Sequence, residues 1–226
     1  MIKIKTYKIH LIRHGMTMAN VNGQYAGVWD VPVCEEGIKK LEDLKQSYEY
    51  PKVDEVYSSP LTRCLQTARI IYPDINAEVV ENFKEWNFGE WEGKTTKELM
   101  QDPHYVKWVE SGRALSVPGG ESGEEFGKRI CTAFEVIVNS IIKRGIESTA
   151  IFTHGGVIMS LLTTYGIPKA RFLDWICDNG CGYSLSIMPS FWMRDKVLEV
   201  YEKVPKGSNS QIDGKFKELI DKLKQI

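Results

Sequence analysis

Five residues in this 226-residue sequence have the chemical types needed to bind a phosphoryl group and transfer it. Two histidines and two arginines could hold the anion, and one carboxyl group could protonate a leaving oxygen. Each lies in or beside a short motif, and the motifs are far apart along the chain. The five are Arg13, His14, Arg63, Glu85 and His154. Their chemistry makes a phosphatase or a phosphomutase the leading hypothesis.

The first motif, Arg13-His14-Gly15, directly follows a predicted strand. Gly15 allows a sharp turn that could present backbone amides to an anion, and the Arg13 guanidinium matches phosphate oxygens. A neutral nitrogen of His14 could attack phosphorus, because nearby arginines disfavour the protonated imidazole. Thr17 and Asn20 follow in the same loop and could add neutral donors. Taken alone, a histidine at a strand end is more often structural.

The other three residues also occupy positions that suit an anion. Arg63 falls in the first turn of a helix that opens at Pro60, where backbone N–H groups attract negative charge. His154 precedes Gly155-Gly156 at another predicted helix start, and as a cation or strong donor it could stabilise a transferring phosphoryl group. Aromatic neighbours of Glu85 predict partial burial, which would raise its pKa and keep a proton available. A surface arginine and a solvated carboxylate are the plain alternatives.

Alternating strand-like and helix-like segments have to position these residues. The strands are expected at residues 7–13, 53–58, 76–83, 148–153, 183–188 and 196–203, and the helices at 37–48, 61–72, 122–144 and 157–165. We expect one catalytic domain over residues 1–204, with an irregular, aromatic-rich cap at about 86–121 that holds a short helix near 96–100. Residues 205–226 read as a polar linker and a final amphipathic helix.

This order of elements predicts an α/β fold with three α/β/α layers and a mostly parallel central sheet. Ligands of such sheets bind outside the carboxyl ends of the strands. Arg13-His14, Ser58-Ser59 and Thr153-His154 each fall just past a predicted strand end. Three separate segments should therefore deliver polar groups to one edge of the sheet.

Bulk properties exclude several other classes of protein. With 29 basic and 30 acidic residues the formal charge is −1, which disfavours a nucleic-acid partner. No secretory leader and no apolar run of membrane-spanning length is visible, so we expect a cytoplasmic protein without a membrane partner. Five scattered cysteines argue against a disulfide framework, and Cys177 and Cys181, without a histidine nearby, are a weak metal-site candidate. No nucleotide-binding glycine motif is present.

Six ordered motifs resemble those of the histidine phosphatase superfamily, which includes cofactor-dependent phosphoglycerate mutases and many small phosphatases. They lie at residues 11–20, 27–32, 58–68, 85–93, 118–122 and 153–156, within a resemblance that spans roughly residues 7–188. The resemblance implies a phosphoglycerate mutase-like fold. It also implies that His14 is the nucleophile that becomes phosphohistidine and that Glu85 is the proton donor and later the base. No metal and no other cofactor is implied. The expected substrate-binding residues are Arg13, Thr17, Asn20, Arg63, His154 and Gly155.

The cap distinguishes the two main activities of such proteins. Phosphoglycerate mutases normally carry a longer insert with paired basic residues that close over a carboxylate. Between Gly93 and Pro118 the basic residues are never adjacent, and the short 118–122 segment resembles the phosphatase branch, including α-ribazole phosphatases and broad-specificity phosphatases. We therefore expect metal-independent hydrolysis of a small phosphomonoester, with mutase activity as the alternative. Departures from the family pattern at Ala26 and at Val33-Cys34 bear on specificity.

Three alternatives stay open from the sequence. Trp86, Trp91, Tyr105 and Trp108 could line an open site for a larger phosphomonoester, or pack under the cap. The chain could be a catalytically silent binder of phosphorylated ligands, although all five catalytic positions are filled. The final helix could pack on the core or join two copies in a homodimer.

Overall fold

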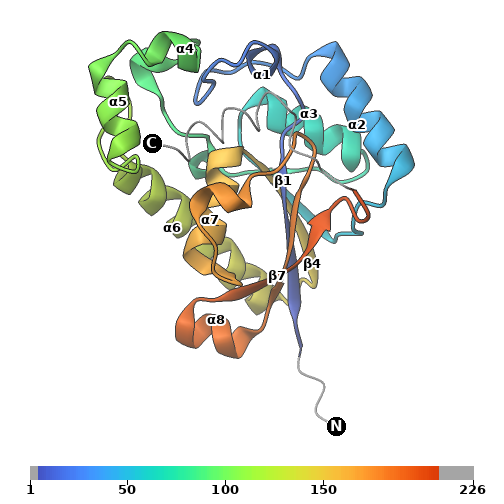
Figure 1. Ribbon diagram of the computed structural model, residues 1–226. Helices are drawn as coiled ribbons and strands as arrows, with labels where there is room; N and C mark the ends of the chain where they lie inside the picture. The colour runs from blue at the N-terminus through green and yellow to red at the C-terminus, as the bar shows by residue number, and fades with distance from the viewer. Residues whose placement is uncertain (1–4, 209–226) are drawn as a thin grey trace.

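A computed structural model describes residues 5–208 of the chain, and a seven-stranded sheet forms the centre of this part (Figure 1). The strands are β1 (Tyr7–Arg13), β2 (Glu55–Ser58), β3 (Glu78–Val79), β4 (Ser148–Thr153), β5 (Gly166–Ile167), β6 (Gly182–Ile187) and β7 (Leu198–Val204). Their order is β3-β2-β4-β1-β6-β7-β5. The pairs from β3 to β1 are parallel, as is β5 with β7, whereas β6 is antiparallel to both β1 and β7.

Helices cover both faces of the sheet (Figure 1). One face carries α2 (Glu35–Ser47) and α3 (Thr62–Ile71), and the other carries α6 (Gly123–Arg144) and α7 (Gly155–Tyr165). Alternate residues of β1 supply the two apolar cores, because Ile9 and Leu11 join one buried cluster and Ile12 joins the other. The predicted three-layer α/β/α fold with a mostly parallel sheet is confirmed.

The long helix α6 shows why its ends were readable from the sequence. Ser122 caps the first turn by accepting from the Glu125 N–H, while the Glu125 carboxylate accepts from the Ser122 N–H at 2.8 Å. This is a capping box, and Gly145 ends the helix in the left-handed conformation with φ 77°. Its buried stripe includes Phe126, Phe134 and Ile141, so the helix packs firmly on the sheet.

The predicted strand at 76–83 is wrong over most of its length. Only Glu78–Val79 pair with β2, and both residues are exposed at the sheet edge. The chain then turns through a short 3₁₀ segment, η1 (Glu81–Phe83), where Phe83 is fully buried. This turn takes the backbone away from the sheet and toward the carboxyl ends of the parallel strands. β3 is the last strand of the sheet and pairs only with β2, so few hydrogen bonds hold the segment in the sheet.

The cap contains more helix than the sequence reading expected. Besides α4 (Thr96–Leu99), a second helix, α5 (Pro103–Glu110), follows an Asp102 that accepts from the His104 N–H at 2.8 Å. An acidic N-cap followed by proline is a helix-start signal, and the sequence analysis did not use it. The cap also contains a short 3₁₀ segment, η2 (Gly89–Trp91).

The cap aromatics form a packed core. Trp86, Trp91, Tyr105 and Trp108 are all at most 5% exposed, and the Trp86 ring stacks on Phe126 with centroids 4.7 Å apart. Packing under the cap is therefore the correct alternative for these four side chains. The idea that they line an open site is wrong.

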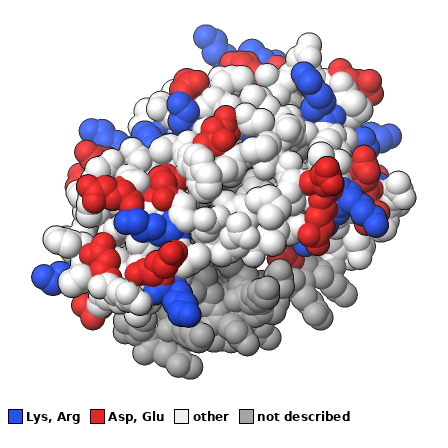
Figure 2. Space-filling model, turned by 90° about the horizontal axis from the view of Figure 1, so that it is seen from above, with Lys and Arg blue, Asp and Glu red and all other residues white. Residues whose placement is uncertain are grey.

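The remaining elements are short. They are α1 (Met18–Val21), η3 (Phe172–Trp175) and α8 (Pro189–Asp195), which the sequence reading missed. Viewed from the edge above β1, the surface in Figure 2 shows basic and acidic side chains interspersed around the rim. No helix within residues 5–208 has the length and apolar character needed to cross a membrane. The predicted final helix lies outside the described residues.

Candidate active site

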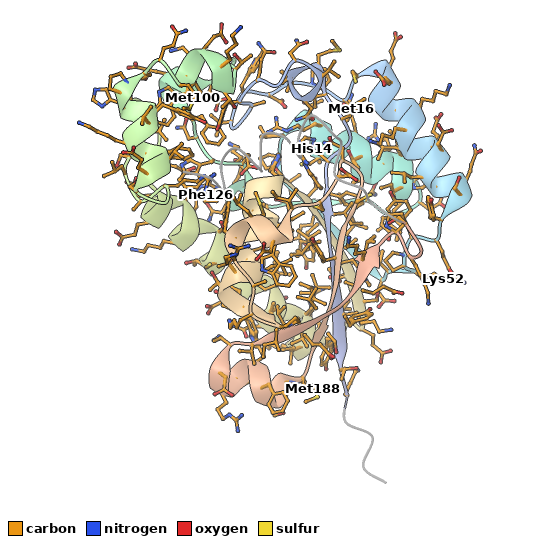
Figure 3. The ribbon with its side chains drawn as sticks, viewed as in Figure 1. His14, Met16, Lys52, Met100, Phe126 and Met188 are labelled. Atoms are coloured by element: carbon orange, nitrogen blue, oxygen red, sulfur yellow. The ribbon has the colours of Figure 1, made fainter. Side chains whose placement is uncertain are left out.

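The two predicted catalytic histidines meet at the carboxyl ends of neighbouring parallel strands. His14 follows β1 and His154 follows β4, and their ring centroids lie 5.3 Å apart with a 58° angle between the planes. Figure 3 shows His14 just above the end of β1, on the side of the sheet where the cap lies. His14 is 5% exposed and His154 is fully buried, so both rings are shielded from bulk water.

The position of the proton on His14 follows from its neighbours. Its Nδ1 lies 2.8 Å from the Gly15 carbonyl oxygen, and because a carbonyl can only accept, Nδ1 must carry the proton. Nε2 therefore keeps its lone pair in the neutral ring. Burial, followed by the charges of Arg63 and Arg13, holds the pKa of His14 well below its usual range.

The backbone N–H of Gly15 is engaged within the protein, because it donates to Thr67 Oγ1 at 2.8 Å. That backbone amides of this turn contact an anion stays a prediction. A Cβ at this position would lie 2.6 Å from Leu41 Cδ1 on α2. A side chain at this position would therefore require the Leu41 side chain to shift.

Arg63 is held by the loop that carries the 27–32 motif. Its Nη1 donates to the Trp29 carbonyl at 2.9 Å, and its Nη2 donates to the carbonyls of Gly27 and Ala26 at 2.6 and 3.2 Å. The Arg63 Nε is buried and has no hydrogen-bond partner among the described residues. Asp30 fastens the same loop to the start of α3 by accepting from the Thr62 N–H and hydroxyl.

Arg13 and Gly155 lie against each other. The Arg13 Nη1 donates to the Cys177 carbonyl at 2.8 Å, and a Cβ on Gly155 would lie 3.6 Å from Arg13 Nε, an ordinary contact. The guanidinium therefore lies between the segment before β6 and the first residue of α7. The structure brings Arg13, Arg63 and both histidines to one sheet edge.

The surroundings of His154 favour its neutral form, so of the two expected states, cation or strong neutral donor, the second is favoured. Burial, with the charges of Arg63 and His14, holds its pKa well below its usual range. Its Nε2 lies 2.8 Å from Ser59 Oγ, and Cys64 Sγ lies 3.5 Å from the same nitrogen. Burial raises the pKa of the Cys64 thiol to about 12, so the sulfur is an uncharged neighbour.

Glu85 joins the site through the start of α7. Its Oε2 accepts from the Gly156 N–H at 2.8 Å, and its Oε1 accepts from the Trp86 N–H at 2.9 Å. Burial raises the pKa of the Glu85 carboxyl, and these two N–H groups partly oppose the effect. The predicted direction of its pKa is therefore confirmed.

Thr17 and Asn20 are engaged mainly with each other. The Thr17 side chain and N–H both donate to Asn20 Oδ1 at 3.1 Å, and Thr17 Oγ1 accepts from the Asn20 N–H, which caps α1. Asn179 Nδ2 donates to Asn20 Oδ1 at 3.2 Å and to the His14 carbonyl at 3.0 Å. The pair shapes the loop beside His14, and substrate contacts by either residue stay a prediction.

Four side chains at the site were missed as functional candidates. Ser59 belongs to a motif that was recognised, so its position between a strand end and a helix was an available signal. Cys64 was counted only as a thiol. Asn179 and Arg129 gave no signal, because they reach the site from a loop and from the polar side of α6.

The chain is similar to several known proteins in sequence and in structure. A family model described as "Histidine phosphatase superfamily (branch 1)" matches residues 9–197. An adenosylcobalamin/alpha-ribazole phosphatase from Escherichia coli (strain K12) is 26% identical over 81% of this chain and 92% of its own. Phosphoserine phosphatase 1 from Hydrogenobacter thermophilus is 29% identical over 85% and 91%, respectively. The crystal structure of the alpha-ribazole phosphatase from Shigella flexneri, at 25% identity, superposes with a TM-score of 0.70 over 86% of this chain and 94% of that one.

Proposed function

Since the chain belongs to the histidine phosphatase superfamily, branch 1, we propose that it is a phosphatase that hydrolyses phosphomonoesters without a metal ion, through a phosphohistidine at His14. Relatives named as phosphatases support the general class. The mechanism and the substrate class are proposed from the residues of the site.

One observation carries the proposal. The proton of His14 is fixed on Nδ1 by the Gly15 carbonyl, so Nε2 is a free lone pair beside a second histidine and two arginines. A nucleophile has to be unprotonated at the reacting atom, and a phosphate binds where positive charge and donors converge. This arrangement meets both requirements at one point.

In the first step His14 Nε2 attacks phosphorus and the bond from phosphorus to the ester oxygen breaks. Glu85 transfers its proton to that oxygen, so the product leaves as a neutral alcohol. Arg13 and Arg63 compensate the charge on the non-bridging oxygens, and a neutral His154 can contribute one N–H donor.

In the second step water attacks the phosphohistidine. The deprotonated Glu85 takes a proton from that water, the phosphorus–nitrogen bond breaks, and inorganic phosphate leaves. His14 returns to its neutral form and Glu85 to its protonated form. The cycle consumes one water for each ester, and every proton is accounted for within the site.

The substrate we propose is a small phosphorylated metabolite. The names of two relatives, which specify adenosylcobalamin/α-ribazole and phosphoserine, support phosphorylated metabolites as the class and do not choose among them. Mutase activity is less favoured, because the cap between Gly93 and Pro118 has an aromatic core and no adjacent pair of basic residues.

The test is phosphate release in EDTA from a panel of sugar phosphates, phosphoserine, phosphoglycerates, nucleoside phosphates and an aryl phosphate. We expect turnover with water, together with acid-labile, base-stable labelling of His14 when a ³²P-labelled substrate is quenched rapidly. Interconversion of phosphoglycerates that depends on bisphosphoglycerate, with little hydrolysis, would replace the phosphatase with a mutase. Binding of phosphorylated ligands with no release from any of them would identify a silent binder.

A further inference from the structure

The segment that carries Glu85 has irregular backbone. It lies between η1 and η2, and neither a helix nor a strand fixes its peptide groups. Other groups must therefore satisfy its carbonyls and hold its shape. This matters for the proposed function, because a general acid has to lie within hydrogen-bond reach of the leaving oxygen.

Arg129 on α6 supplies the missing donors. Its Nη1 donates to the carbonyls of Asn82 and Lys84, both at 2.8 Å, and its Nη2 donates to the Glu85 carbonyl at 2.9 Å. The Nε and Nη2 groups also donate to the Glu121 carboxylate at 2.9 and 2.6 Å. All five N–H groups of the guanidinium are thus used, three of them on the backbone around the acid.

Glu121 holds the residues that follow the acid. Its Oε1 accepts from the Asn87 N–H at 2.8 Å, and its backbone carbonyl accepts from the Trp86 indole N–H at 3.0 Å. Its own N–H donates to the Asn87 carbonyl at 3.1 Å. The side chains of Arg129 and Glu121 are only 22% and 15% exposed. The pair is largely shielded from water and fixes three consecutive residues.

We propose that the ion pair of Arg129 and Glu121 is a positioning device for the general acid, and that it sets where the Glu85 carboxyl group meets the leaving oxygen. The inference rests on the proposed function, since it presumes that Glu85 donates the proton. Arg129 binds the backbone of Glu85 and not its carboxyl group. It therefore acts through Glu85, and it is a positioning residue.

The chemistry of the leaving group separates this role from a purely structural one. The leaving group of an aryl phosphate is a stabilised phenoxide, which needs little help from an acid. The leaving group of an alkyl phosphate would be a strongly basic alkoxide, so its departure depends on proton transfer. A misplaced acid should therefore slow alkyl phosphates selectively, whereas general damage to the site should slow both.

The experiment compares kcat/KM for β-glycerophosphate and p-nitrophenyl phosphate, because kcat/KM reports the steps through phosphohistidine formation. For Arg129→Gln we expect a loss of about 30-fold with the alkyl ester and less than about threefold with the aryl ester. Arg129→Lys should fall between wild type and Arg129→Gln, since an ammonium group cannot reproduce the planar fork. The matched control is Arg144→Gln, another α6 arginine that binds a carboxylate, Glu55, away from the site. It should leave both values unchanged.

Glu85→Gln and the double variant Glu85→Gln/Arg129→Gln complete a thermodynamic cycle. If Arg129 acts through Glu85, the double variant loses no more activity on β-glycerophosphate than Glu85→Gln alone. Equal losses on both esters, or additive losses in the cycle, would overturn the positioning role. Should Arg129→Gln fail to fold in a thermal melt, Arg129→Lys and Glu121→Gln take its place in the same comparison. If wild type releases no phosphate from either ester, the proposed function itself fails, and that result is distinct from an active wild type that is indifferent to Arg129.

Discussion

Two buried histidines lie four residues apart at β1, and their hydrogen bonds differ in a way that separates their chemistry. Within the strand, His10 has both ring nitrogens engaged, Nδ1 with Ser184 Oγ at 2.8 Å and Nε2 with Ser148 Oγ at 3.2 Å. Just past the strand, His14 has Nδ1 engaged with a carbonyl at 2.8 Å, and no hydrogen bond of its Nε2 to another described residue is found. Burial lowers the pKa of both.

Burial and a lowered pKa therefore do not identify a nucleophile. A hydroxyl can donate or accept and so satisfies either ring nitrogen, whereas a carbonyl forces the proton onto one nitrogen and frees the other. Cavity size misleads as well, because His10, Ser148 and Ser184 line a cavity of about 890 Å³ at the opposite edge of the sheet. The free nitrogen at a convergence of cations is the better criterion.

His14 and His10 should differ most in their effect on activity. His14→Ala should lower kcat/KM for phosphate release at least about 10³-fold, because it removes the nucleophile. His10→Gln should stay within about threefold of wild type, because glutamine can still bond to both serines and His10 takes no part in the reaction. The measurement is steady-state phosphate release on one aryl ester, with a thermal melt to show that each variant is folded. Comparable losses in both variants would contradict the criterion of the free nitrogen.

The buried histidines should also make the stability of the folded protein depend on pH. Burial and the charge of Lys8 lower the pKa of His10 from about 6.5 to about 4. Between these values the unfolded chain binds a proton that folded His10 does not, so folded-state stability falls as pH falls from about 6.5 to about 4. A shift of this size corresponds to up to about 3 kcal/mol. His14 and His154 act in the same direction.

Urea unfolding at pH 7 and at pH 4 measures this contribution. Wild type should lose up to about 3 kcal/mol more between the two pH values than His10→Gln, which cannot be protonated. The carboxylates contribute equally to both proteins and cancel in the comparison. A pH dependence identical in wild type and variant would show that His10 titrates normally in the folded protein.

The fold was predictable where local signals and tertiary structure agree. The boundaries of β1 and β4 match the sequence reading because their apolar runs end at turn-forming motifs, and α6 matches because Ser122 and Gly145 cap it. The segment 76–83 was wrongly predicted as a strand because only Val79, Val80 and Phe83 are typical of strands, whereas its Asn, Ala and Glu residues are not. The strand accordingly covers Glu78–Val79 alone, and a 3₁₀ turn follows it.

The site was predictable in its residues and less so in their states. Motifs identified both histidines, both arginines and Glu85. Their common location was predictable because the carboxyl ends of parallel strands lie together at one end of the sheet. The protonation of His154 was not predictable, since it depends on complete burial beside other positive groups. Nor was Arg129, because hydrogen bonds from an arginine to irregular backbone leave no pattern in the sequence.

The smallest expected change in activity concerns Glu85, whose carboxyl group is hydrogen-bonded and still able to react. Both Glu85 oxygens accept an N–H, yet a protonated carboxyl group still has an O–H to donate, so unlike His10 it retains a group for a substrate. A methyl group on Gly156 would overlap these oxygens, so Gly156→Ala should displace the acid and lower kcat/KM for an alkyl phosphate about tenfold. Gly127→Ala on α6 is the matched control, because within residues 5–208 a Cβ there meets no atom within 4 Å beyond its chain neighbours and the backbone of its own helix. The control should raise stability by about 0.5–1 kcal/mol through helix propensity and leave activity unchanged. Full activity in Gly156→Ala would mean that the Glu85 carboxyl group tolerates displacement. The geometric contrast between the His10 ring, whose nitrogens are both engaged, and the Glu85 carboxyl group would then fail.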